Sequence, residues 1–166
     1  LDLLAFIDLC IKHGLYLNIK PGPWICAEEK NGGYPDWLVE KSSLQVLDSN
    51  DRVVMGYNYP FQSPIPSYLH PDYLNAVERW MKAVDAKIKP FLYPKGPIIL
   101  MQLDNEPCYT FHDAFFESDY NPVNTGENGY YQRWLKDRYS SIDVLNQAHG
   151  RLYQGFDQIQ APRSLE

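Results

Sequence analysis

The chain has 166 residues, of which 45% are hydrophobic and 22% charged, as in ordinary globular domains. Its formal net charge of −6 argues against binding to nucleic acid or to anionic membrane surfaces. No apolar run approaches the ~20 residues that a membrane-spanning helix needs, so we expect a globular protein whose function is carried by its motifs.

The first predicted elements are a helix and a short strand. Apolar residues at helical spacing begin at Leu1 and end near Gly14, a residue that commonly stops a helix. Residues 15–20 then have the composition of a strand. Because the apolar pattern is already under way at Leu1, we expect the chain to open inside an element of a larger domain.

The strand opens into a loop, residues 21–38, that combines Gly and Pro with carboxylates, Asn and large aromatic residues. Sugar-binding sites use this mixture, because polar groups hold hydroxyls while aromatic faces cover the apolar side of the ring. An ordinary rigid loop explains the same residues, with Trp24 and Trp37 as packing residues and Glu28 and Glu29 in solvent.

A long connection, residues 36–71, precedes the next predicted helix. Connections of this length are usually functional or disordered, so Tyr57 and Tyr59 either line a substrate site or belong to a plain surface excursion. Pro71 suits the first position of a helix that runs to about Lys89. The apolar stripe that we expect this helix to bury consists of Leu74, Val77, Trp80, Met81 and Val84.

The run from Ile98 to Leu103 predicts a strand, because it is apolar except for Gln102 and lies between Pro97 and Pro107. Such a run is typical of a parallel strand covered on both faces. The triplet 104–106, Asp-Asn-Glu, follows at the carboxyl end of the strand, where α/β barrels place their chemistry. A glutamate held there against an apolar sheet can act as a proton donor, although a plain strand-ending turn accounts for the same triplet.

The remaining sequence predicts an extended loop over residues 108–128 and two further helices. Tyr130 to Arg138 suggests one helix, and Ser141 caps another that ends at Gly150. Its expected buried side is Ile142, Leu145 and Ala148. No pair of Cys or His residues has the spacing of metal ligands, so we expect no metal and no cofactor. Of the three cysteines, Cys10 is expected in the core, whereas Cys26 and Cys108 form either a disulfide or two free thiols.

Two motifs together resemble a known family. The stretch PGPWICAEEKNGGYPDWL (residues 21–38) resembles the signature of glycoside hydrolase family 35 β-galactosidases, and GPIILMQLDNEP (residues 96–107) fits the strand that follows it there. The tail, residues 130–163, looks more like family 42 β-galactosidases. Both families belong to a clan of retaining glycosidases built on (β/α)8 barrels.

The resemblance implies roles for five residues. Glu106 matches the acid/base glutamate of the clan, and Asn105 matches the neighbour that contacts the sugar 2-hydroxyl. Cys26, Ala27 and Glu28 match the stretch that contacts galactose hydroxyls. The usual Trp after the loop glutamate is Glu29 here, and the usual Tyr after the catalytic glutamate is Pro107. These two departures weaken the implied preference for galactose.

We therefore expect an α/β fold that is part of a (β/α)8 TIM barrel, about strands 3 to 4 with flanking helices and long loops. Residues 1–166 would form a partial catalytic domain truncated at both ends, since a whole barrel needs about 250 residues. The expected function is retaining hydrolysis of terminal β-galactosides, with the nucleophile outside this chain and the isolated piece inactive. The alternatives are a clan relative that acts on another sugar, such as a β-glucosidase, β-mannanase or β-glucanase, or a noncatalytic carbohydrate-binding protein on the same fold.

Overall fold

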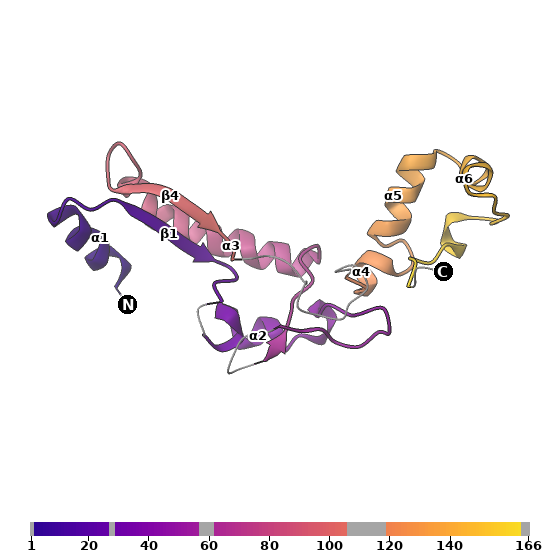
Figure 1. The fold of residues 1–166 in the computed structure, drawn as a ribbon, viewed down its shortest axis with the longest axis horizontal. Helices are drawn as coiled ribbons and strands as arrows, with labels where there is room; N and C mark the ends of the chain where they lie inside the picture. Colours follow the sequence, from indigo (N-terminus) through magenta and orange to yellow (C-terminus); the bar gives the residue numbers. More distant parts are fainter. Residues whose placement is uncertain (1, 27–28, 57–61, 106–118, 164–166) are drawn as a thin grey trace.

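The computed structural model describes residues 2–26, 29–56, 62–105 and 119–163. The molecule is elongated, with the two termini toward opposite ends (Figure 1), and its mixture of helices and strands confirms the expected α/β class. None of the helices in these ranges is long and apolar enough to cross a membrane. In chain order the elements are α1 (Leu3–Lys12), β1 (Leu17–Gly22), η1 (Lys30–Gly33), α2 (Asp36–Val39), η2 (Ser42–Leu44), β2 (Met55–Gly56), β3 (Ser63–Pro64), α3 (Pro71–Ile88), η3 (Lys89–Phe91), β4 (Ile98–Leu103), α4 (Pro122–Thr125), α5 (Tyr130–Tyr139), α6 (Ile142–His149) and η5 (Phe156–Gln158).

The part that positions the site is a parallel strand–helix–strand unit. β1 pairs with β4 in parallel, and α3 provides the crossover between them, as parallel neighbours require. In Figure 1, α3 lies along one face of the pair. A shared core holds the unit together and consists of Ile7, Cys10, Leu17, Ile88 and Ile98.

The bounds predicted for β4 are confirmed, but the expected burial on both of its faces is wrong. Only Ile98 is buried, whereas Leu100 is 59% and Leu103 is 64% exposed. Of the β4 residues, Ile98 alone belongs to a core cluster in the described part of the chain, so the other apolar side chains of the strand are not covered there.

The prediction for α3 is right in its bounds and wrong in part for its stripe. Leu74 and Trp80 are about half exposed, whereas Tyr73 and Ile88 are the buried residues of this helix. The helix contacts two separate clusters: its first half packs beside Leu38 and Leu44, and its end packs on the sheet. Because α3 packs on two separate clusters, its buried residues do not form the single apolar stripe that the periodicity predicts.

Residues 36–67, which we call the insert, are more than the plain surface excursion that was one of the two alternatives for the connection 36–71. They contain the antiparallel pair β2–β3 and bury a small cluster of Val46, Val54 and Ile65. Tyr57 and Tyr59, the proposed aglycone contacts, lie outside the described residues. The insert is therefore a packed unit between the β1 loop and α3.

The last part of the chain contains α5 and α6, which pack together through Leu135, Leu145 and Ile159. α6 begins at its Ser141 cap, where the hydroxyl accepts from the Val144 N–H, and ends at Gly150 in the left-handed region, as predicted. Ala148 is exposed rather than buried, because α6 presents only the Leu145 side to its neighbours. The loop predicted for residues 108–128 contains the short helix α4 in its described part.

Candidate functional site at the carboxyl ends of β1 and β4

The two strands end side by side, as the sequence predicted for neighbouring parallel strands. Gly22 is paired with Leu103, and the Asp104 N–H donates to the Gly22 carbonyl at 3.1 Å. The loop after β1 and the turn after β4 therefore leave the sheet at one edge, which is where α/β folds place their ligands.

Asp104 joins the turn after β4 to the loop after β1. It adopts the left-handed region at φ 60°, which Asp and Asn tolerate better than most residues. Its Oδ1 accepts a hydrogen bond from the Trp24 N–H at 2.8 Å. Burial raises the pKa of the Asp104 carboxyl, and the Trp24 and Asn105 N–H groups oppose this shift. The half-buried carboxylate of Asp104 thus fixes the turn after β4 on the loop after β1, next to Asn105.

Asn105 is held by two donors from the strands. Its Oδ1 accepts from the Lys20 Nζ at 2.8 Å and from the Gln102 Nε2 at 3.2 Å. Gln102 also donates to the Asp104 carbonyl at 3.1 Å. Because Lys carries only donors, the amide oxygen must face Lys20, and the amide NH2 points away from Lys20. The sequence analysis did not identify Lys20 and Gln102 as site residues. Both are polar residues near the carboxyl ends of two adjacent strands, and this position could have indicated them.

The loop after β1 closes on itself around Cys26. The N–H groups of Ile25 and Cys26 both donate to the Gly32 carbonyl, at 2.9 and 3.2 Å. Cys26 has a φ of 61° and is a partly buried free thiol, and Cys10 is a buried free thiol in the core as expected. The possible partner Cys108 lies outside the described residues.

Trp24 forms the wall of this loop, which supports its interpretation as a packing residue. A Cβ on Gly32, whose φ is 61°, would lie 1.9 Å from the Trp24 ring, so only glycine fits there. The Trp24 ring also contacts the Tyr34 ring, with centroids 5.6 Å apart. Trp37, the other proposed packing residue, is 57% exposed.

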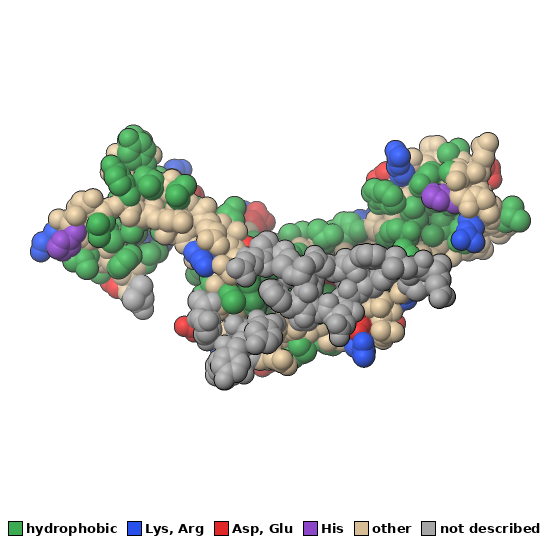
Figure 2. All heavy atoms as spheres, in the orientation of Figure 1, with side chains coloured by type: hydrophobic (Ala, Val, Ile, Leu, Met, Phe, Trp, Pro, Cys, Tyr) green, Lys and Arg blue, Asp and Glu red, His purple; other side chains and the backbone are tan. Residues whose placement is uncertain are grey.

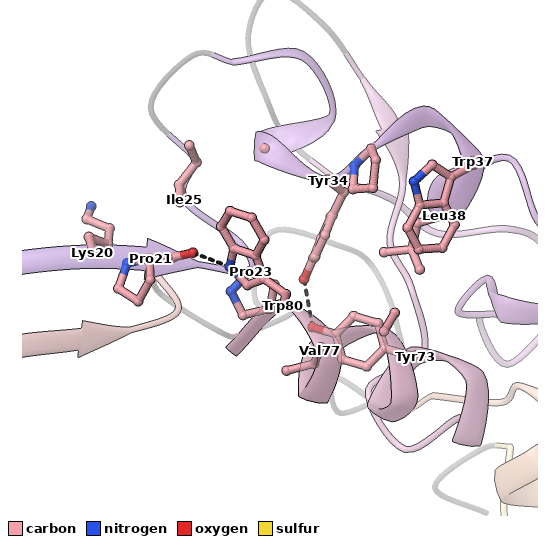
Figure 3. A pocket seen from close by; sticks show the side chains of 13 residues that line it. Lys20, Pro21, Pro23, Ile25, Tyr34, Trp37, Leu38, Tyr73, Val77 and Trp80 are labelled. Atoms are coloured by element: carbon pink, nitrogen blue, oxygen red, sulfur yellow. Dashed lines mark hydrogen bonds between the residues drawn. The ribbon is translucent and has the colours of Figure 1, made fainter. Parts of the chain in front are cut away.

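An apolar cavity of about 510 Å³ lies between this loop and α3 (Figure 3). Tyr34 and Tyr73 meet at its back through a hydrogen bond between their hydroxyls at 3.0 Å, and burial raises the pKa of both phenols. The Trp80 indole N–H donates to the Pro21 carbonyl at 2.8 Å. The polar groups of this wall are thus used within the protein. Lys20, which donates to Asn105, also lines the cavity, so the cavity adjoins the carboxyl edge of the two strands.

The structure describes two of the five predicted site residues. Asn105 and Cys26 lie on adjacent connections at the carboxyl edge, joined through the Asp104–Trp24 hydrogen bond. Glu106, Ala27 and Glu28 lie outside the described residues, so their roles stay predictions. Within the described ranges, no group of three His, Cys, Asp or Glu side chains could hold a metal ion.

Comparison with known proteins agrees with this arrangement. Residues 1–62 match the model of the glycosyl hydrolases family 35. The chain is 39% identical to an exo-β-D-glucosaminidase of Pyrococcus horikoshii over 99% of its length, covering 21% of that protein. It is 39% identical to a mouse β-galactosidase over 72% of its length, covering 15% of that protein, and 35% identical to a β-1,2-glucosyltransferase of Ignavibacterium album over 97%, covering 21%.

These matches show that the chain is similar to glycosidases and, at 35% identity, to one glucosyltransferase. The family model covers the loop motif at residues 21–38 on which the family 35 resemblance depends. The resemblance of the tail to family 42 stays a prediction. The chain spans between 15% and 21% of the length of these curated relatives.

Proposed function

We propose that this chain is part of the (β/α)8 barrel of a retaining β-glycosidase, in which Glu106 is the acid/base residue. The family 35 match and the names of the relatives support a glycosidase. The parallel β1–α3–β4 unit, with polar side chains at its carboxyl edge, has the organisation of two successive barrel strands.

One observation carries the proposal: the end of β4 is tied to the end of β1. The Asp104–Trp24 and Asn105–Lys20 hydrogen bonds, both 2.8 Å, hold the residues just before Glu106 beside the loop just before Glu28. A glycosidase needs this proximity, because its proton donor must lie within reach of the sugar that the loop recognises.

In the proposed mechanism, Glu106 protonates the departing glycosidic oxygen and then deprotonates the water that releases the sugar. Asn105 contacts the 2-hydroxyl, where hydrogen bonds strengthen in the transition state. Cys26, Ala27 and Glu28 select the hydroxyl pattern of the sugar. The nucleophile, a second carboxylate about 5–5.5 Å from the first in retaining enzymes, would come from outside these 166 residues.

Terminal β-galactosides are the first candidate substrates, as the family 35 motif predicts. β-D-Glucosaminides are the second, because similarity to the Pyrococcus protein extends over 99% of the chain and similarity to the mouse protein over 72%. Glu29 and Pro107, which depart from the galactosidase pattern, add to the case for testing both sugars.

The test is Glu106→Gln in the full-length protein, assayed with aryl β-glycosides. We expect kcat/KM to fall by about 10²–10⁴ with a poor leaving group, and by much less with dinitrophenyl glycosides, whose leaving group needs no proton. With both kinds of substrate kcat falls, because release of the sugar still needs the base. Glu127→Gln, which changes an exposed glutamate, is the matched control. Unchanged kinetics in Glu106→Gln would remove Glu106 from the mechanism, and sugar binding without hydrolysis by the wild type would favour the noncatalytic alternative.

A further inference from the structure

We propose that Lys20 determines specificity at C2 of the sugar, by favouring a 2-hydroxyl over a 2-ammonium group. The inference rests on the proposed function, in which Asn105 contacts the C2 substituent. It goes beyond that function because it chooses between the two candidate sugars on the charges and hydrogen-bond donors present at the site.

The first step is the orientation of the Asn105 amide. Lys20 and Gln102 both approach Oδ1 through nitrogen, at 2.8 and 3.2 Å. An ammonium has donors only, so the oxygen of the amide is committed to Lys20 and its NH2 points away. Asn105 therefore offers a donor to the ligand.

The second step is the match with the substrate. A sugar 2-hydroxyl can accept a hydrogen bond from the Asn105 NH2, whereas a protonated 2-amino group has only donors. Two donors facing each other leave both without a partner, and sites that are built around a hydrogen bond reject such analogues strongly.

The third step is charge. The Lys20 ammonium lies 2.8 Å from the amide oxygen, so a cation hydrogen-bonded at the other end of the same amide lies within roughly 8 Å of it. Like charges at that separation repel appreciably near a protein surface. Within the ranges 2–26, 29–56, 62–105 and 119–163, Lys20 forms no ion pair. The inference thus separates this chain from the exo-β-D-glucosaminidases that it resembles.

The experiment compares substrates that differ only at C2. The full-length protein is assayed at about pH 6, where the amino group of an amino sugar is protonated. The substrates are the 4-nitrophenyl β-glycosides of galactose and of 2-amino-2-deoxygalactose, and the same pair in the glucose series. The measured quantity is the ratio of kcat/KM within each pair, which cancels any preference at C4.

We expect the wild type to favour the 2-hydroxyl sugar by at least about tenfold within a pair, the size of one modest charge repulsion. Lys20→Met, which removes the charge and the donor, should narrow the ratio by about tenfold. Lys20→Arg, which keeps both, should retain it. General structural damage lowers kcat/KM for both members of a pair and leaves their ratio unchanged.

The outcomes separate the two proposals. A ratio that is the same in Lys20→Met, or a wild type that prefers the amino sugar, overturns the inference while hydrolysis that depends on Glu106 sustains the proposed function. In the second case the carboxylates of the 26–29 loop, rather than Lys20, would set the preference. Failure to hydrolyse any of the four glycosides overturns the proposed function and the inference with it.

Discussion

At the scale of single residues, the clearest energetic feature is the buried pair of tyrosine hydroxyls. Tyr34 and Tyr73 are each about 5% exposed and share one hydrogen bond of 3.0 Å. A buried hydroxyl that loses its partner costs about 1–3 kcal/mol, whereas removing both members of a pair can be nearly neutral. The pair is therefore suited to a double-mutant cycle.

We expect Tyr34→Phe and Tyr73→Phe each to lower the free energy of unfolding by about 1–3 kcal/mol, and the double variant to cost less than the sum. Denaturant unfolding of the full-length protein followed by tyrosine fluorescence measures all four corners of the cycle. Additive single effects would show that the two hydroxyls are energetically independent.

The same pair predicts a response to alkaline pH. Burial raises the pKa of both phenols, so the unfolded chain loses these protons first, near its ordinary pKa of about 10. The stability that depends on the neutral phenols is fully present below that pH and falls as the pH rises above it. The double Phe variant should lose less stability above pH 10 than the wild type, because the other tyrosines titrate in both.

The residues at the carboxyl ends of β1 and β4 were predictable from the sequence in part. The placement of Asn105 at the end of a strand beside the 21–38 loop follows from apolar runs and breakers, and the structure confirms it. The Lys20–Asn105 contact joins residues 85 positions apart. Strand register decides such a pairing, and no local pattern encodes register between two strands separated by a helix.

At the scale of elements, Asn121 fastens α4 to the insert. Its Nδ2 donates to the carbonyls of Ser43 and Gln45 at 2.9 and 2.8 Å, and its Oδ1 accepts from the Val123 N–H as the cap of α4. The residue is 2% exposed. One side chain thus performs a local role at the helix start and a distant role in the tertiary structure.

Asn121→Asp separates these two roles. Aspartate keeps the acceptor that caps α4, but it loses both donors and faces two carbonyl oxygens with a negative charge. We expect a loss of about 2 kcal/mol or more, measured as a lower unfolding midpoint. Asn128→Asp, the same change at an exposed residue that accepts from Lys136, should shift stability by less than about 0.5 kcal/mol. Equal effects at the two positions would assign Asn121 to capping alone.

The ends of helices and the bounds of strands could be predicted from the sequence, whereas the elements that pack against one another could not. Gly14 and Gly150 adopt the left-handed conformation that ends α1 and α6, and Pro71 opens α3, because these signals are local. The insert escaped prediction because its strands have only two residues each and gain their stability from Val46, Val54 and Ile65 in a separate cluster. Periodicity cannot detect elements that short.

At the scale of the whole molecule, the β1–β4 sheet has no third strand at either edge among the described residues. Figure 2 shows hydrophobic side chains at the surface of the part that contains α1, β1 and β4. Leu9, Ile99, Leu100 and Leu103 are each about half exposed or more. Unpaired strand edges with apolar side chains are templates for association with another chain.

We expect the isolated 166-residue chain to self-associate, with a mass by light scattering well above the 19.3 kDa of one copy. Leu100→Lys places a charge on the open strand and should reduce the associated fraction. Leu152→Lys is the matched control, since Leu152 is 91% exposed but lies far along the chain from the sheet. A monodisperse wild-type monomer would contradict this expectation.

The indole of Trp24 occupies the volume that a side chain at residue 32 would fill. A larger residue at 32 therefore meets two obstacles: the ring at 24 must first become smaller, and the new residue must tolerate a φ of 61°, as Asn and Asp do better than most. In descendants of this sequence residues 24 and 32 should change together, with a large side chain at one of the two positions and a small one at the other.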